Sequence, residues 1–394
     1  MKQHLAGLCA LLVAGIAPAA HASTSAPASE AAPASEAAPD RPASAPLYLV
    51  AGSYAPAAEE GIRIFRFDEA TGEATPAGGC AGIADPSYLV ASADGGSLYA
   101  VSETGDETAA LVRLAFDRRS GTLRQGERQP TRGAAPCFVA LDREGRFAAT
   151  ANYSGGSISL FALDSAGRLA APARVVRFAG RGVDPERQEQ PHLHCIAFTP
   201  DGRRLLACDL GLDRIHTFPL VAGARGTEAV DTAGEQSVAL RPVSGPRHLR
   251  FGPDGRFAYL VNELSGQVTV FAHRRGRLRP VQHIAADTTG ARASGDIRIS
   301  PDGRHLYASN RLKNDGLAIF AVDARRGTLR PLGYQPTGPH PRNFALSPDG
   351  RFLLVACRDS DTIEIYARDA ATGLLRDTGR RIAMPRPVCL EFVK

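Results

Sequence analysis

Lysine is scarce in this chain of 394 residues: only three of its 46 basic residues are lysines, and the rest are arginines. The basic residues form no run, and the formal net charge is +5. Proteins that bind nucleic acid concentrate basic residues in a patch or stripe that neutralises phosphates. The composition therefore argues against nucleic acid as a partner.

Long apolar runs are also nearly absent, which excludes a protein with several membrane spans. The one apolar run is N-terminal, over residues 5–17, and it follows the positive charge of Lys2. A small-x-small sequence comes next, at residues 20–22. Together these features predict a secretory signal peptide, residues 1–22, that is cleaved after Ala22. An uncleaved anchor is the alternative, although the run is shorter than the about 20 residues that a span needs.

Residues 23–46 consist mainly of Ala, Pro, Ser and Glu and repeat Pro-Ala-Ser-Glu-Ala-Ala at Pro27 and Pro33. Such a composition cannot bury a hydrophobic core, so we expect a disordered linker. The folded part is then residues 47–394. The signal peptide predicts that it is periplasmic or secreted.

Closely spaced cysteine pairs are missing too. Six cysteines follow residue 22, and no two are spaced as Cys-x-x-Cys, which excludes the zinc and thioredoxin-type sites that use this motif. Cys195 and Cys208 flank one tight turn, where an oxidising compartment permits a disulfide. Buried free thiols are the interpretation that we favour, because free cysteine packs as a small hydrophobe.

An internal repeat indicates the architecture. A turn of the type Ser-Pro-Asp-Gly-Arg, followed by an apolar strand, occurs six times at intervals of 47 to 57 residues. The glycines of these turns are Gly95, Gly145, Gly202, Gly255, Gly303 and Gly350. A sheet of about four strands in every repeat of this length is typical of a β-propeller.

The strand after the turn can be counted seven times, and so can the strand before it. The last copy of the strand before the turn is the C-terminal Val388–Val393, whereas the N-terminal blade has none of its own. We therefore predict an all-β, seven-bladed β-propeller over residues 47–394, closed by the C-terminal strand in the N-terminal blade. Such closure removes free sheet edges. A pair of β-sandwiches, the alternative, explains neither the repeat nor the missing strand.

The register of the repeat locates a polar rim, which is the end of the propeller opposite the repeated turns. The strand before each turn starts at this rim, and the strand after the turn ends there. Eight residues before the turn glycines stand, among others, His194, Arg247 and Arg342; eight residues after them stand Glu103, Glu263 and Arg311. Charged side chains that converge near a central axis predict a binding or catalytic site. Solvated residues that stabilise strand ends are the alternative for any one of them.

Several arginines at one rim predict an anionic ligand, because a guanidinium pairs two oxygens of a carboxylate or phosphate. Glu263 and His194 are the groups available for proton transfer. The chain contains no Gly-x-Ser-x-Gly sequence, so a serine esterase mechanism lacks support.

A metal site is the alternative for the same rim. His192 and His194 are two residues apart and are potential ligands. The specific form of this alternative is a calcium site built from Asn152, Asp209, Asn262 and Glu263. The nearby arginines would repel a cation, so we predict no metal and no cofactor.

Short motifs at the rim are the most specific signal. They are Pro-Glu-Arg-Gln at 185–188, Pro-His-Leu-His at 191–194, Gly-Pro-Arg-His at 245–248, Val-Asn-Glu-Leu at 261–264, Gly-Asp-Ile-Arg at 295–298 and Pro-Arg-Asn-Phe at 341–344. With them the chain resembles the seven-bladed lactonase family, which includes the cycloisomerase-type 6-phosphogluconolactonases and the fungal carboxymuconate-lactonizing enzymes. The resemblance covers residues 47–394. It implies a propeller that hydrolyses or forms small anionic lactones.

In the lactonizing branch of that family a histidine, two arginines and a glutamate are implicated. By motif these fall on His194, Arg247, Arg311 and Glu263. We expect Glu263 or His194 to activate water, while the two arginines stabilise the developing oxyanion. The residues expected to bind the substrate are Arg298, His340 and Arg342, with His192 and Arg187.

The predicted function is thus hydrolysis of a small anionic, sugar-type lactone, as in the 6-phosphogluconolactonases. Two alternatives remain. One is a lactonizing cycloisomerase of the carboxymuconate type, which runs the same site in reverse. The other is a non-catalytic periplasmic propeller that binds a ligand or partner on the same rim, since propellers have many functions.

Overall fold

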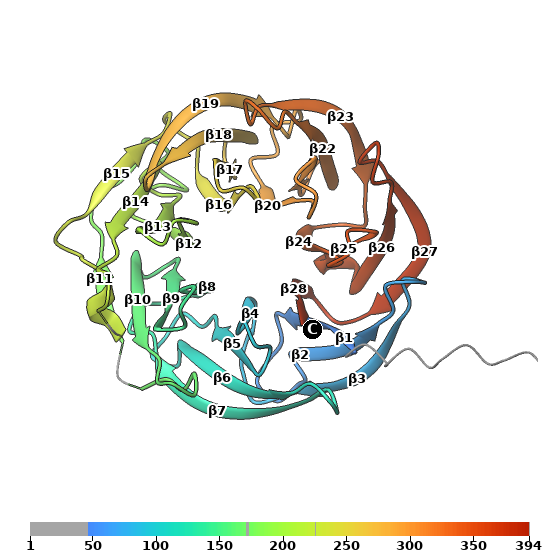
Figure 1. The fold of residues 1–394 in the computed structure, drawn as a ribbon, viewed down its shortest axis with the longest axis horizontal. Coiled ribbons are helices and arrows are strands. Elements are labelled where there is room, and N and C mark those ends of the chain that lie inside the picture. Colours follow the sequence, from blue (N-terminus) through green and yellow to red (C-terminus); the bar gives the residue numbers. More distant parts are fainter. Residues whose placement is uncertain (1–45, 171–172, 225, 394) are drawn as a thin grey trace, which may run out of the picture. The chain divides into compact units, whose positions relative to one another are not determined.

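The structure, a computed structural model, describes residues 46–170, 173–224 and 226–393. These residues form seven four-stranded antiparallel sheets. Figure 1 shows the sheets following one another around a central axis, as the blades of a propeller. The predicted all-β, seven-bladed β-propeller is confirmed.

The predicted signal peptide, 1–22, lies outside the described residues, and so does the predicted linker, 23–46, apart from its last residue. Two short 3₁₀ helices interrupt the strands: η1 (Gly226–Ala229) and η2 (Arg358–Ser360). No helix in the described ranges is long and apolar enough to cross a membrane.

Each blade has an innermost strand nearest the axis and three further strands toward the outside (Figure 1). The innermost strands are β28 (Pro387–Val393), β4 (Leu89–Ala91), β8 (Pro136–Leu141), β12 (Leu193–Phe198), β16 (Pro246–Phe251), β20 (Ser294–Ile299) and β24 (Pro341–Leu346). The second strands are β1 (Leu47–Ser53), β5 (Ser97–Ser102), β9 (Phe147–Asn152), β13 (Arg204–Asp209), β17 (Phe257–Asn262), β21 (His305–Asn310) and β25 (Phe352–Cys357).

The two outer strands of each blade are longer in most blades and more exposed. The third strands are β2 (Ile62–Phe67), β6 (Ala110–Asp117), β10 (Ser157–Ala162), β14 (Arg214–Pro219), β18 (Gln267–Arg274), β22 (Gly316–Val322) and β26 (Thr362–Arg368). The outermost strands are β3 (Ala74–Cys80), β7 (Thr122–Pro130), β11 (Arg174–Arg177), β15 (Gln236–Ala239), β19 (Arg277–Ala285), β23 (Leu329–Pro336) and β27 (Leu375–Ala383).

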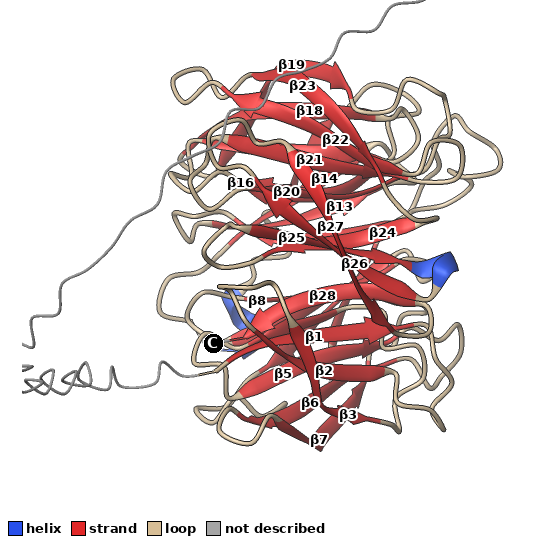
Figure 2. Cartoon of the chain, turned by 90° about the vertical axis from the view of Figure 1, so that its right-hand side faces the viewer, coloured by secondary structure: helices blue, strands red, loops and turns tan. Residues whose placement is uncertain are grey.

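The C-terminus completes the N-terminal blade, whose strand order is β28-β1-β2-β3. β28 pairs antiparallel with β1, from Tyr48 opposite Val393 to Ser53 opposite Pro387 (Figure 2). The predicted closure is therefore confirmed. It joins both ends of the ring in one hydrogen-bonded sheet, so the inner edge of β1 is paired.

The repeated turns join the innermost strand of each blade to the second strand. Their six glycines have φ between 65° and 72°, a left-handed conformation that costs little only for glycine. In five of the six turns an aspartate precedes the glycine and accepts a hydrogen bond from the backbone N–H two residues further on, as Asp302 does from Arg304 at 3.0 Å. The repeat seen in the sequence is thus explained by turn geometry.

Both faces of the blades are covered by neighbouring blades, so the second strands are largely apolar. Every residue of β5, β9 and β21 is buried. Tyrosines of second strands also reach the outer hairpin of the next blade: Tyr307 Oη donates to the carbonyl oxygen of Gly373 at 2.7 Å. These contacts hold the seven blades in register and thereby fix the strand ends at the polar rim.

Candidate functional site

A β-bulge lies at the start of six innermost strands, at the polar rim: β8, β12, β16, β20, β24 and β28. In β16, Pro246 is opposite Asn262 and His248 is opposite Val261, so Arg247 is an extra residue without a partner. The corresponding extra residues of β8, β12 and β24 are Cys137, His194 and Arg342. A bulge re-aims side chains and is common beside active sites. The bulges therefore explain why polar residues gather eight positions before the turn glycines.

The predicted catalytic residues converge on Glu263, which directly follows β17. Its Oε1 accepts a hydrogen bond from Arg187 Nη2 at 2.7 Å. Its Oε2 accepts one from Arg247 Nε at 2.8 Å and lies 3.2 Å from Arg311 Nη2. His194 Nε2 is 4.0 Å from the same oxygen. One carboxylate thus gathers three guanidiniums and an imidazole from three blades and a loop.

The surroundings of the buried Glu263 side chain favour its ionised form. Burial by itself raises the pKa of a carboxyl, but the charges of Arg311, Arg247 and Arg187 together hold the pKa of Glu263 far below its ordinary value. This single negative charge balances only one of the three guanidiniums. Burial, together with Arg247 and Arg342, also lowers the pKa of Arg311 to about 9 despite its contact with Glu263. The site therefore carries excess positive charge, which attracts an anion.

His194 is held in its neutral form. Burial and the adjacent Arg247 keep the pKa of His194 well below 6.5. Its Nδ1 lies 3.6 Å from Cys137 Sγ, and its ring meets the ring of Tyr153 edge-on, with the centroids 5.5 Å apart. A neutral imidazole at this place offers one ring nitrogen, Nε2, toward Glu263.

Arg342 differs from the other arginines of the rim in its partners. Arg247 Nη1 donates to the carbonyl oxygen of Gly295 at 2.9 Å, and Arg311 Nε donates to that of Ala293 at 2.8 Å. The Arg342 guanidinium lies 5.2 Å from the ring centroid of Tyr54, a cation–π contact. It donates no hydrogen bond to a residue in the described ranges, so its donors are available to a ligand.

The two other predicted histidines support the cluster. His340 Nε2 lies 3.2 Å from Arg311 Nη1, and burial together with Arg311 lowers the pKa of His340 to about 3. His192 stacks on Tyr153 with centroids 4.4 Å apart, and its two ring nitrogens lie 3.1 Å from the Tyr153 carbonyl oxygen and from Glu189 Oε1. Both ring nitrogens of His192 thus have partners within the protein, and its ring stacks on Tyr153. His192 therefore positions Tyr153.

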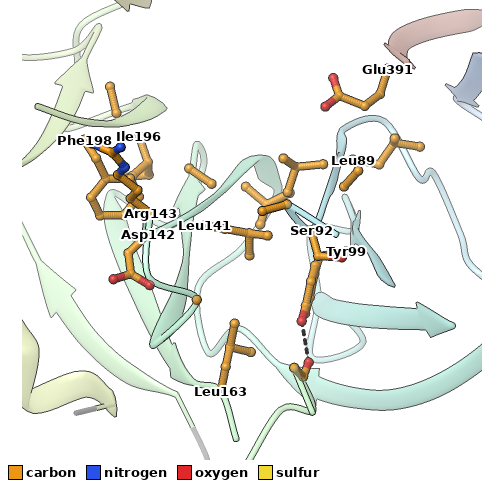
Figure 3. A pocket seen from close by; sticks show the side chains of 18 of the residues that line it. Leu89, Ser92, Tyr99, Leu141, Asp142, Arg143, Leu163, Ile196, Phe198 and Glu391 are labelled. Carbon is orange, nitrogen blue, oxygen red and sulfur yellow. Dashed lines mark hydrogen bonds between the residues drawn. The ribbon is translucent and has the colours of Figure 1, made fainter. Parts of the chain in front are cut away.

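Arg298 does not join the cluster, in contrast to the prediction. Its Nε donates to Asp296 Oδ2 at 2.9 Å. Its side chain lines a separate cavity of about 860 Å³ that reaches the repeated turns at residues 92–94 and 142–145. Figure 3 shows this cavity, with Glu391 and Phe198 in its walls. Arg298 lies further along its strand than the rim position, toward the turns. It is therefore at a different depth along the propeller axis from the cluster around Glu263.

Two cavities lie at the rim itself. The larger one, about 610 Å³, is lined by Arg187, Glu263 and Arg311 together with loop residues 184–186 and 291–293. This volume is in the range of small-molecule pockets, roughly 300–1,000 Å³. A second cavity of about 10 Å³ has room for about one water molecule. Its polar walls are Ser87, Glu103, Cys137, His194, Arg247, His248, Arg342 and Asn343.

The ligands of the calcium alternative do not converge. The Asn152 and Asn262 amides donate to hydroxyl groups of the neighbouring third strands, at 2.8 and 3.0 Å. Asp209 accepts the backbone N–H of His192 at 2.9 Å. Each side chain thus stabilises a strand end in its own blade. Over the described ranges, no group of three or more His, Cys, Asp or Glu side chains is arranged to hold a metal ion.

The six cysteines of the described part of the chain are free thiols. Cys195 and Cys208 face each other across β12 and β13, as the tight turn between them predicted. Sequence reasoning missed Tyr54 as a neighbour of the site, whereas Ser87 stands eight residues before Gly95, at the rim position. Glu103 stands eight residues after its turn glycine, as Glu263 does after its own. This shared position is the sequence signal that places Glu103 at the rim.

The fold and the rim together define the class: a seven-bladed propeller with three arginines gathered on a buried carboxylate at one end. The sequence model of one family, described as lactonase, 7-bladed beta-propeller, matches residues 48–392. The chain belongs to this lactonase family.

Its relatives include named lactonases. A 6-phosphogluconolactonase of Formosa agariphila is 36% identical over 321 residues, which are 80% of this chain and 90% of the relative. A crystal structure of a 6-phosphogluconolactonase candidate from Bacteroides fragilis has a TM-score of 0.86 and 48% identity, and the match covers 90% of this chain and 99% of that one. The structure of the periplasmic gluconolactonase of Pseudomonas aeruginosa has a TM-score of 0.81 and 36% identity. The match covers 88% of this chain and 99% of that one.

Proposed function

We propose that the protein hydrolyses a small sugar-type lactone at the polar rim, with His194, Arg247, Glu263 and Arg311 at the centre of the site. The observation that carries this proposal is the convergence of three guanidiniums on the single carboxylate of Glu263, beside a cavity of about 610 Å³. The names of the relatives support a six-carbon sugar lactone as the substrate.

Opening of a lactone begins when water adds to the carbonyl carbon, which places negative charge on the carbonyl oxygen. Arg247 and Arg311 are fixed by Glu263 and by backbone carbonyl oxygens, so they need little reorganisation to stabilise that charge. Arg342, whose donors are available, meets the anionic or hydroxyl groups of the substrate. Glu263 has both oxygens occupied by guanidiniums, and its role is to position them.

A panel of lactones tests this function. D-glucono-1,5-lactone, its 6-phosphate and a carboxylated five-membered lactone are each mixed with the protein, and acid release is followed with a pH indicator. We expect hydrolysis well above the spontaneous rate for at least one of the two sugar lactones. If no lactone reacts faster than in buffer, the rim is a binding surface and the non-catalytic alternative holds.

We also propose that the protein is exported after cleavage at Ala22. The sequence features of residues 1–22 support this, and the structural neighbour from Pseudomonas aeruginosa is itself described as periplasmic. Intact-mass measurement of the protein recovered from its host gives the test. A mass that still includes residues 1–22 would remove the case for a cleaved signal.

A further inference from the structure

A second carboxylate, that of the partly exposed Glu103, faces the site from the other side of the propeller axis. Glu103 directly follows β5, as Glu263 directly follows β17, and Figure 1 shows these two strands on opposite sides of the axis. The two glutamates therefore occupy the same register position in blades that face each other. A ligand held between them at the rim meets one carboxylate on each side.

The partners of the two glutamates differ. Glu263 is within ion-pair distance of Arg187, Arg247 and Arg311. Glu103 instead accepts hydrogen bonds from two hydroxyl groups, Ser87 Oγ and Tyr54 Oη, the latter at 3.2 Å. In the described part of the chain, no arginine or lysine nitrogen lies within 4.0 Å of its carboxylate. Glu103 is thus hydrogen-bonded to neutral hydroxyl groups, whereas Glu263 is paired with cations.

Glu103 also borders the water-sized cavity of about 10 Å³, whose lining includes His194, Arg247 and Arg342. A water molecule needs two or more polar partners in such a space, and these walls supply them. The lining contains an acceptor for the water's proton, Glu103, and two guanidiniums, Arg247 and Arg342, that can bind the oxygen of an attacked carbonyl. Geometry of this kind brings base, nucleophile and oxyanion donors together.

The two environments move the carboxyl pKa values apart. Burial is the largest influence on Glu103 and raises its pKa, against the opposing effects of Arg342, Ser87 and Tyr54. The guanidiniums lower the pKa of Glu263 far below the ordinary range. A carboxylate with a raised pKa binds a proton more readily, and environments that separate two carboxyl groups in this way assign their roles.

We propose that Glu103 is the general base of the reaction and acts on a water molecule held in this small cavity; the inference rests on the proposed lactonase function. Glu103 takes one proton from the water molecule while the oxygen of that water forms a bond to the lactone carbonyl carbon. The tetrahedral oxyanion collapses, the ring C–O bond breaks, and the proton passes from Glu103 to the ring oxygen. The product hydroxy acid then ionises and releases one proton to solvent.

The test is the pH dependence of hydrolysis in Glu103→Gln. We expect kcat to fall by about 10²–10⁴-fold, with KM within a few-fold of the wild type, because a base in the transition state is lost. The wild-type kcat should decline at acidic pH with a midpoint above the ordinary carboxyl pKa of about 4.3, and the variant should lose this limb. The matched control is Glu107→Gln, an exposed glutamate of the same loop, which should keep full activity.

The outcomes separate the two proposals. If the wild type hydrolyses a lactone and Glu103→Gln keeps its kcat and its acidic limb, the role of Glu103 is refuted while the lactonase function stands. If the wild type hydrolyses no lactone, the function itself fails. Should the Gln variant not fold, Glu103→Asp provides the same readout, because shortening a general base lowers kcat and shifts the acidic limb, whereas a structural residue leaves the midpoint unchanged.

Discussion

We expect that a chain that ends at residue 386 does not reach a cooperatively folded state. It lacks β28, which pairs with β1 along its whole length and buries Cys389, Leu390 and Val393. Burial of one such side chain contributes about 1.5–3 kcal/mol, and a whole domain is stable by only about 5–15 kcal/mol. The loss also leaves the inner edge of β1 unpaired. Thermal unfolding followed by circular dichroism measures the effect.

The matched control for this truncation removes the other end of the chain. A protein that begins at residue 46 keeps all seven sheets and should melt cooperatively, at the temperature of the full-length protein. If the C-terminal truncation also melts cooperatively at an unchanged temperature, the closing strand is dispensable and the proposed basis of ring stability is wrong.

The second large effect concerns Arg247, which is 1% exposed at the centre of the rim. Arg247→Ala should lower kcat/KM for the lactone by about 10²–10³-fold, because it removes a preorganised donor to the oxyanion. Arg247→Lys should not restore activity, since one ammonium group cannot reproduce the fork that joins Glu263 Oε2 and the Gly295 carbonyl oxygen. Steady-state kinetics, corrected for the folded fraction, provide the measurement.

Arg304→Ala is the control for Arg247. Arg304 is exposed in a repeated turn at the far end of its blade, so its loss should leave kcat/KM within about twofold of the wild type. Equal losses of kcat/KM in the Arg247 and Arg304 variants would indicate that the loss of a positive charge anywhere on the protein lowers activity, and not the loss of a specific contact at the rim. Full activity of Arg247→Lys would show that a bidentate contact is not required.

The fold was predictable because its signals are local and repeated. Each Pro-Asp-Gly turn is encoded by a few adjacent residues, and Val388–Val393 supplied the strand that the first blade lacked. The convergence of Arg247 and Glu263 was predictable for the same reason, since both lie a fixed number of residues from one turn. Sequence reasoning placed the polar rim correctly by counting from these turns.

The sequence does not reveal features that depend on contacts across the axis. The β-bulges add one residue to a strand without a recognisable motif. The surroundings of Glu103 and Glu263 differ because different guanidiniums face each of them, and two of these, Arg187 and Arg311, come from outside the blade of Glu263. Arg298 was assigned to the rim through its motif, although it lies further along β20 toward the turns. The motif does not show how deep along the propeller axis the Arg298 side chain lies.

The central claim is that the polar rim is the lactonase site. A crystal structure with bound D-gluconate, the acid formed from a six-carbon lactone, tests this most directly. We predict that the gluconate lies at the rim between Glu103 and Glu263, with its carboxylate within hydrogen-bond distance of Arg342 or Arg247. Gluconate found only in the cavity of about 860 Å³ beside Arg298, with the rim empty, would contradict the account.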